Sequence, residues 1–210
     1  MREVDGEEFW HLARPRPGGR EVRLTEGLRL YTGLDYNPFH RHLYKKAYLC
    51  RGNRQYILSG LLNRRDELLA DPAQLYDLAL TGLRHATLQL RERIMEEVRA
   101  ADFPDHPSRL RCFWLADSPD SVTYWRNKLG SIAGQGLTLW RVAARGRVHL
   151  GSNRWVKNDS LSLETYYHNA RQYWAGRDVG GAADELVLEG ELTLLHHCDL
   201  ETLEPLPPGR

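Results

Sequence analysis

The chain has 210 residues, which is long enough for one compact domain with a sizeable core. Hydrophobic residues make up 41% and charged residues 27%, and the formal net charge is only +1, so the composition favours neither a disordered chain nor strong overall attraction to nucleic acid or membranes. No apolar run approaches the roughly 20 residues of a membrane span, and the charged first residues are unlike a signal peptide. The three widely separated cysteines indicate reduced thiols, so we expect a single cytoplasmic domain over residues 1–210 with no membrane partner.

The first quarter of the chain predicts one strand followed by irregular structure. The segment EFWHLARP, residues 8–15, mixes aromatic and aliphatic side chains and ends at a proline, which indicates a strand. Residues 24–52 show no clear period and contain Gly, Pro and Asn. We therefore expect loops and short elements there.

The middle of the chain predicts two helices. Asp71 and Pro72 suit the cap and the first position of a helix. Small or aliphatic residues then recur every three or four positions as far as Phe103: Leu75, Ala79, Leu83, Ala86, Leu90, Ile94 and Val98. Because residues 56–70 (YILSGLLNRRDELLA) also favour a helix, we predict a helical hairpin inserted at about residues 55–103.

The second half of the chain alternates strands with short helices. The predicted strands are LRCFWLA (110–116), LTLWRVAARGRVHLG (137–151, as one or two strands) and DELVLEGELTLL (184–195, with a bend at Gly190). The predicted helices are SPDSVTYWRNKLG (118–130) and SLSLETYYHNARQYWAG (160–176). This order predicts an α+β fold and disfavours a doubly wound sheet.

Several common site motifs are absent from the sequence. His40 and His42 in HRH, and His196 and His197 beside Cys198 in HHC, lack the paired spacing of a zinc site, so no metal is predicted. No glycine-rich phosphate loop follows a strand, and no GxSxG nucleophile motif is present.

A run of basic residues precedes the long helix. Residues 41–65 contain seven Lys and Arg residues and no Asp or Glu, with tyrosines between them. Lysines and arginines with interleaved aromatic residues are what single-stranded nucleic acid requires, whereas the alternative is a solvated face balanced by acids elsewhere. The residues predicted to contact phosphates are Arg41, Lys45, Lys46, Arg51 and Arg54.

Three segments, in this order, resemble the His-Tyr-Glu branch of the ADP-ribosyltransferase superfamily. FWHLARP carries His11 on the first strand, CFWLADSPDSVTYW carries aromatic residues around a Ser-containing turn, and ADELVLEGEL carries Glu185 at the entry to a late strand. The segment EEVRAADFPDHPSRLRCFWL also resembles a bacterial family of the DUF2441 type placed in that superfamily. The resemblance implies a split antiparallel or mixed β core of the ADP-ribosyltransferase type with the helical hairpin as an insertion.

The resemblance also implies NAD as a substrate, and assigns roles to residues of this chain. Glu185 would stabilise the positive charge that grows on the ribose when the bond to nicotinamide breaks. His11 would hold the other ribose, Trp114 and Tyr124 would sandwich the nicotinamide ring, and Arg109 would pair with the pyrophosphate. The complete predicted NAD-binding set is His11, Arg14, Arg109, Trp114, Ser121 and Tyr124.

Each of these residues also has an ordinary structural interpretation. His11 is compatible with a hydrogen-bonded strand histidine, Trp114 with a core position, and Arg109 with a cap of the preceding helix. If the strand alternates regularly, Phe113 and Trp125 are the core partners of the two ring-binding residues.

Two further acidic residues, Glu189 and Glu191, compete with Glu185 for the catalytic role. In arginine-modifying members of the superfamily a Ser or Glu stands two residues before the catalytic Glu, whereas Ala183 stands there in this chain, which disfavours protein arginine as the acceptor. We therefore expect the protein to transfer ADP-ribose to a macromolecule, and the basic run favours nucleic acid as that acceptor. Its expected role is that of a bacterial toxin or defence effector, which an antitoxin or immunity protein would inhibit. The alternatives are an NAD glycohydrolase that uses water and a non-catalytic nucleic-acid-binding module.

Overall fold

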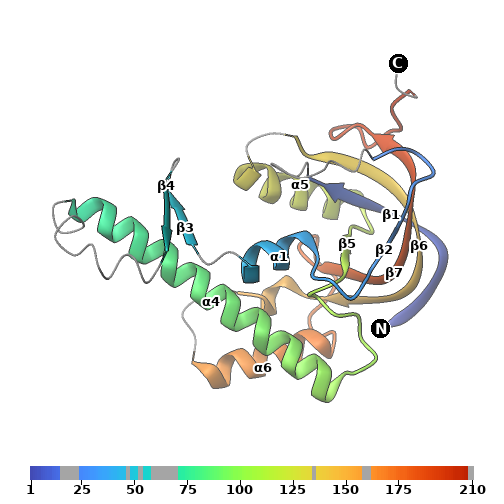
Figure 1. Ribbon diagram of the computed structural model, residues 1–210. Coiled ribbons are helices and arrows are strands. Elements are labelled where there is room, and N and C mark those ends of the chain that lie inside the picture. Colours follow the sequence, from blue (N-terminus) through green and yellow to red (C-terminus); the bar gives the residue numbers. More distant parts are fainter. Residues whose placement is uncertain are drawn as a thin grey trace.

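Five antiparallel strands form the sheet that organises the structure (Figure 1). The computed structural model describes residues 1–14, 24–45, 48–51, 54–57, 71–133, 136–157 and 162–207. The strands are β1 (Arg2–Ala13), β2 (Arg29–Tyr31), β5 (Phe113–Leu115), β6 (Thr138–Gly151) and β7 (Glu185–Cys198). They run in the order β1-β6-β7-β2, and β5 also pairs with β7. With the helices packed beside this sheet, the predicted α+β class is confirmed.

A pair of glycines bends the two longest strands. Gly146 of β6 lies opposite Gly190 of β7, and both have positive φ values, 133° and 149°. A Cβ atom at either glycine would collide with the backbone of the facing strand, so only glycine permits this close approach. The bend predicted at Gly190 thus belongs to both strands, and the curved sheet encloses its own core.

Short strand β5 joins β7 to β1. It pairs with β7 through Phe113–Leu115, and the next residue, Ala116, exchanges two backbone hydrogen bonds of 2.9 Å with Trp10 of β1. Segments that are about a hundred residues apart in sequence therefore become neighbours.

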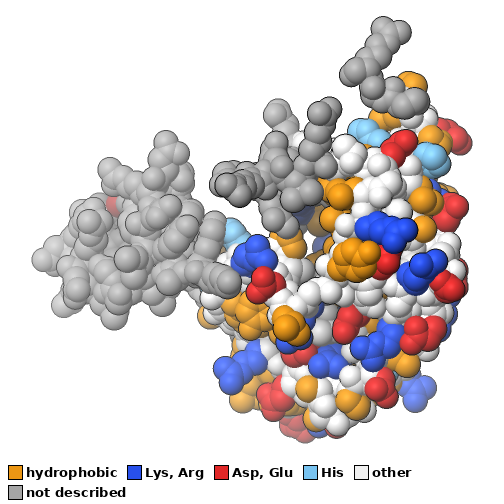
Figure 2. Space-filling model, turned by 45° about the vertical axis from the view of Figure 1, so that its right-hand side comes forward, with side chains coloured by type: hydrophobic (Ala, Val, Ile, Leu, Met, Phe, Trp, Pro, Cys, Tyr) orange, Lys and Arg blue, Asp and Glu red, His pale blue; other side chains and the backbone are white. Residues whose placement is uncertain are grey.

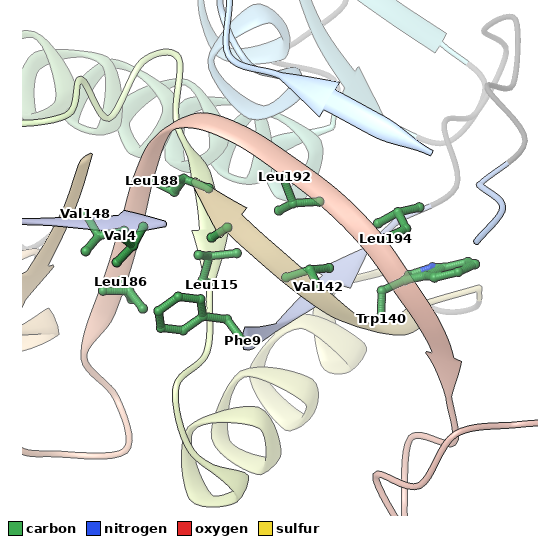
Figure 3. Packing of buried hydrophobic residues seen from close by; sticks show 11 residues of the cluster. Val4, Phe9, Leu115, Trp140, Val142, Val148, Leu186, Leu188, Leu192 and Leu194 are labelled. Carbon is green, nitrogen blue, oxygen red and sulfur yellow. The ribbon is translucent and has the colours of Figure 1, made fainter. Parts of the chain in front are cut away.

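The concave face of the sheet holds the main hydrophobic core (Figure 3). Alternate residues of β1, β5, β6 and β7 point into it, as expected for the two-residue period of a strand. Its buried members are Val4, Phe9, Leu115, Trp140, Val142, Ala144, Val148, Leu186, Leu188, Leu192 and Leu194. Burial of each large apolar side chain contributes about 1.5–3 kcal/mol.

Four α-helices of the described residues pack around the sheet (Figure 1). They are α1 (Pro38–Lys45), α4 (Pro72–Asp102), α5 (Pro119–Ala133) and α6 (Leu163–Trp174), with a 3-10 turn at Asn153–Trp155. Helices α4 and α6 share a second apolar cluster, and α5 covers β1 through a third. Among the helices of the described ranges, none is long and apolar enough to cross a bilayer.

The predicted long helix is confirmed, but its buried face was predicted incorrectly in part. Leu83 and Leu90 are 57% and 38% exposed, whereas Glu92, Met95 and Val98 are buried. The apolar spacing predicts one buried stripe along the whole helix, but only the C-terminal half of α4 packs on α6.

Residues 24–52 contain the strand β2 and the helix α1, which are short elements, as predicted. Asn37 caps α1 by accepting a 3.0 Å hydrogen bond from the His40 amide. Two further element predictions need correction. Helix α5 continues past Gly130 to Ala133. The predicted helix over residues 56–70 starts inside β4 (Arg54–Ile57), which pairs with β3 (Tyr48–Arg51), and the rest of that helix lies outside the described residues.

Candidate functional site

A chain of buried charged groups joins the start of β7 to helices α4 and α6. The guanidinium of Arg109, in the segment before β5, donates from Nη1 to the Glu185 carboxylate and to the Tyr173 hydroxyl, the latter at 2.9 Å. Its Nε donates to Oε2 of Glu92 at 3.2 Å. Glu92, Arg109 and Glu185 are only 1%, 3% and 7% exposed. Arg109 therefore bridges two buried carboxylates, and its removal would leave Glu185 with the Tyr173 hydroxyl as its remaining side-chain partner among the described residues.

The other end of this chain reaches helix α1. Oε2 of Glu92 lies 3.0 Å from Nε2 of His40, and Oε1 of Glu92 accepts a 2.6 Å hydrogen bond from Arg91. Nδ1 of His40 lies 3.0 Å from Oδ1 of Asn37, whose Nδ2 in turn donates to the carbonyl of Arg109 at 2.8 Å. Both ring nitrogens of His40 therefore face oxygen atoms of the cluster.

Burial and neighbouring charges shift the pKa values of Glu92, Arg109 and Cys112. Burial alone would raise the pKa of Glu92, but the Arg109 guanidinium and the His40 hydrogen bond outweigh it and hold that pKa well below its usual range. Burial alone would lower the pKa of Arg109, but Glu185 and Glu92 raise it well above its usual value. Burial also raises the pKa of the neighbouring Cys112 thiol, which donates to the Arg109 carbonyl at 3.3 Å. Cys112 is thus a protonated structural thiol and is unsuited to nucleophilic chemistry.

The predicted catalytic residue Glu185 and the predicted phosphate ligand Arg109 therefore come together, and they bind each other. Tyr173, Glu92 and His40 complete the cluster and were not predicted. The position of Glu92 in the sequence could have indicated its role. It lies three residues before Met95 on the packed face of a helix, where a buried carboxylate requires a partner.

The two predicted ring-binding aromatics have different neighbours. Trp114 stacks on His40, with ring centroids 5.9 Å apart and an interplanar angle of 17°, and meets the edge of Phe39 at 6.0 Å. Tyr124 meets Trp125 edge to face at 5.2 Å, and its hydroxyl accepts from Asn153 at 3.4 Å. Within the described ranges no direct ring contact joins Trp114 to Tyr124.

The two predicted core partners also differ in their surroundings. Phe113 packs against the main core, as expected from strand alternation. Trp125 is half-buried, and its Nε1 donates to the carbonyl of Asp184 at 3.1 Å, directly before Glu185.

His11 lies beside the aromatic strand. Its Nδ1 is 2.9 Å from the carbonyl of Trp114, and its ring meets Phe113 edge to face at 6.1 Å. Burial lowers the pKa of His11 despite that backbone hydrogen bond, so the ring is neutral at physiological pH and donates from Nδ1.

The other two predicted NAD contacts lie along helix α5. Ser121 is buried in its first turn, where the Ser121 amide donates to the Ser118 hydroxyl at 3.2 Å. Arg14 follows β1, and its Nη2 donates to the carbonyl of Leu129 at 3.4 Å. The predicted site residues thus form two groups, one around Glu185 and one on α5.

The competing carboxylates on β7 have partners of their own. Glu189 accepts from the Ser108 amide at 3.0 Å and from Arg147 at 3.3 Å. Glu191 lies 3.4 Å from Arg29 on the part of β7 that pairs with β2. Glu185 is the member of the three that contacts Arg109 and Tyr173.

The predicted basic run is described only in part. Lys46 lies outside the described residues, whereas Lys45 ends α1, Arg51 ends β3 and Arg54 begins β4. Arg41 donates to the carbonyl of Tyr36 at 3.4 Å and lies 3.9 Å from the Asp35 carboxylate. On the face shown in Figure 2, the acidic and basic side chains of the described residues are interspersed.

These features define an α+β protein whose curved antiparallel sheet carries a buried acid–base cluster at the start of its last strand. Residues 20–201 match the family described as "Protein of unknown function (DUF2441)", and the chain belongs to this family, as its sequence predicted. No curated protein matches the chain.

Proposed function

We propose that the protein consumes NAD and transfers ADP-ribose, with Glu185 as its catalytic carboxylate. The observation that supports this proposal is the adjacency of three strands that are distant in sequence. Strand β5, with Trp114, pairs with β7, which starts at Glu185, and the Trp10–Ala116 bridge joins it to β1, which carries His11. This is the order and neighbourhood that the resemblance to ADP-ribosyltransferases requires.

The hydrogen bonds of Glu185 fit a role toward a ribose. Both Arg109 and Tyr173 approach Oε2 of Glu185, and no hydrogen bond from the described residues reaches Oε1. One oxygen is therefore fixed by the protein, and the other has capacity for a ligand hydroxyl. The Arg109 guanidinium pairs with this fixed oxygen, and a carboxylate held in this way can stabilise positive charge that grows on a ribose.

The proposed reaction balances without a metal or a redox partner. The bond between the anomeric carbon and nicotinamide breaks, and the electron pair leaves with nicotinamide. The acceptor forms a new bond to the anomeric carbon and releases its proton to water. Glu185 accepts a hydrogen bond from a ribose hydroxyl and stabilises the oxocarbenium-like positive charge. Arg109 and Tyr173 act as positioning residues, because they hold the carboxylate in one orientation. In this proposal Arg109 serves Glu185, and the pyrophosphate requires other contacts, such as Arg14.

The aromatic residues and the acceptor complete the proposal. Trp114 has one face covered by His40, and we propose that its other face meets nicotinamide. We further propose nucleic acid as the acceptor, because of the basic run. The resemblance alone supports a role as a cytoplasmic toxin or defence effector that an inhibitory partner restrains.

The test compares Glu185→Gln with Glu189→Gln. With labelled NAD and a cell extract, we expect Glu185→Gln to lower NAD consumption about a hundredfold or more, by the usual scale of lost transition-state electrostatics. Glu189→Gln removes the same charge from the same strand and should retain most activity. Circular dichroism confirms that both variants are folded. Loss of activity in Glu189→Gln alone would transfer the role to Glu189, and a wild-type protein that consumes no NAD would refute the proposal.

A further inference from the structure

A second candidate site lies away from the proposed NAD residues. A cavity of about 560 Å³ opens where β6 extends past the start of β1, between the C-terminal ends of α4 and α6. Its walls include Phe103, His106, His149, Leu150 and Trp174, and none of the residues predicted to bind NAD lines it. The volume lies within the range of about 300–1,000 Å³ that is typical of small-molecule sites.

The cavity wall contains a buried hydrogen-bond acceptor that has no partner. His149 is 2% exposed, and its Nε2 lies 3.1 Å from the carbonyl of Tyr173. A carbonyl only accepts, so Nε2 carries the proton and Nδ1 carries a lone pair. Among the described residues no group donates to that Nδ1. Nδ1 of the adjacent His106 is likewise buried without a partner, and because buried polar atoms are nearly always satisfied, the two nitrogens point to a hydrogen-bonding group from outside the chain.

Both imidazoles of the cavity are neutral. Burial lowers the pKa of His149 to about 3, with a smaller contribution from His106. Burial likewise lowers the pKa of His106, whose ring meets that of His149 edge to face at 4.7 Å. The N-terminal amino group of Met1, which also lines the cavity, contributes to both lowered pKa values, and a neutral imidazole can accept a hydrogen bond from a ligand.

The rest of the wall is aromatic and apolar. Trp174 lies 5.1 Å from the ring of His149, and its Nε1 already donates to the Met95 carbonyl at 2.7 Å. Arg2, at the rim, is held by both carboxylate oxygens of Glu7 at 2.6 Å. The wall therefore offers flat apolar surfaces, two unpartnered imidazole nitrogens and the N-terminal amino group of Met1.

We propose that this cavity binds a flat aromatic molecule that donates one N–H or O–H hydrogen bond to Nδ1 of His149. Aromatic walls favour a planar ring, and the orphan acceptor selects a ring with a donor. This site is independent of NAD chemistry and carries a separate prediction.

The test uses indole and 1-methylindole as probes, because they differ chiefly in the ring N–H. In protein labelled with nitrogen-15 at tryptophan, the Trp174 indole signal, assigned by its loss in Trp174→Phe, should shift and saturate with indole. The affinity for 1-methylindole should be at least about fivefold lower, the scale of one lost hydrogen bond. Equal affinities would overturn the role of His149, and the absence of a saturable shift with indole would overturn the site.

A blocking variant locates the bound probe. Ala175 is an exposed residue of the cavity wall at the end of α6, so Ala175→Phe should cover the opening without disturbing the core. We expect it to abolish the shift. Leu163→Phe, at the exposed start of the same helix, is the matched control and should bind indole normally. Undiminished binding in Ala175→Phe would place the probe elsewhere and refute the proposal.

Discussion

Gly151 of β6 lies directly against the ring of Tyr173, so closely that a Cβ atom at Gly151 would overlap three ring atoms. Gly151 is also the residue that pairs with Glu185 across β6 and β7. The ring is fully buried, and its hydroxyl accepts from Arg109 and donates to Glu185 at 3.3 Å. The absence of a side chain at position 151 therefore sets how deeply Tyr173 reaches into the charged cluster.

We expect Gly151→Ala to destabilise the protein by about 1–3 kcal/mol, the usual cost of overpacking a filled core. The displaced ring should also loosen the hold of Tyr173 on Glu185 and lower NAD consumption. Urea unfolding measures the first effect. Gly130→Ala is the control, since Gly130 is an exposed helical residue with nothing within 4 Å of its Cβ position, and the change should stabilise α5 by up to about 1 kcal/mol. A Gly151→Ala variant as stable as the wild type would show that Tyr173 can move freely.

The free energy of unfolding should begin to fall at a higher pH during acidification than it would if only carboxylates were protonated. The pKa of His149 is lowered from 6.5 to about 3, mainly by burial, and burial also lowers the pKa values of His11 and His106. The unfolded chain binds protons that the folded chain does not, so stability is full above about pH 6.5 and decreases as the pH falls toward 3. Below about pH 4.5 the depressed pKa of Glu92 adds to the loss, because protonation releases its partners.

The variant His149→Phe isolates one contribution to this pH dependence. It keeps a flat ring but removes the titrating group, so the slope of unfolding free energy between pH 6.5 and 4.5 should decrease by about 1.4 kcal/mol per pH unit, the value for one proton. The variant is also expected to be less stable at pH 7, since the Tyr173 carbonyl loses its donor. Urea titrations across this range measure both effects, and an unchanged slope would contradict the lowered pKa of His149.

Trp114 tests whether the aromatic strand binds a ligand or only packs. If its free face meets nicotinamide, Trp114→Ala should raise the NAD concentration needed for half-saturation, and Trp114→Phe should restore part of the affinity because a flat ring remains. Both variants lose packing on His40, so their melting temperatures should fall. Normal NAD saturation in a less stable Trp114→Ala protein would assign the ring to packing alone.

The sequence predicted elements whose signals are local. Helix α4 begins at Pro72 and ends at Asp102, close to both predicted boundaries, because its cap and its terminal proline lie within the segment itself. The α+β class followed from the order of such elements. Helix α1 was predicted only as a short element of unspecified type, although Asn37 and Pro38 carry the same cap signal as Asp71 and Pro72, because the helix is short and its neighbours lack a period.

The candidate site was predictable only where its residues matched a family pattern. Glu185 and Arg109 were selected by resemblance, but their mutual ion pair depends on strand pairing between segments 76 residues apart. His40 and Glu92, 52 residues apart, become partners only because α1 packs on α4. Such long-range contacts arise from tertiary structure, and propensity and periodicity contain no information about them.

The final prediction concerns the acceptor. Replacing Lys45, Lys46 and Arg51 by Ala should weaken binding of a single-stranded oligonucleotide and flatten its dependence on salt. Each lost phosphate contact lowers the slope of log affinity against log salt by about 0.7, so three contacts lower it by about 2. Fluorescence anisotropy at several salt concentrations measures the slope. Hydrolysis of NAD by water should persist if these residues contact only the acceptor.

A control triple variant separates local contacts from overall charge. Arg145, Arg154 and Arg171 are exposed arginines paired with Asp5, Asp178 and Asp102, and their replacement by Ala removes the same net charge. Because each already has an acidic partner, the salt slope should stay close to that of the wild type. An equal loss in both triple variants would mean that net charge, and not the basic run, attracts nucleic acid. If the basic-run variant loses NAD hydrolysis together with oligonucleotide binding, the run contributes to folding or to the NAD pocket. If the wild-type protein binds no oligonucleotide at low salt, a protein or a small molecule becomes the favoured acceptor.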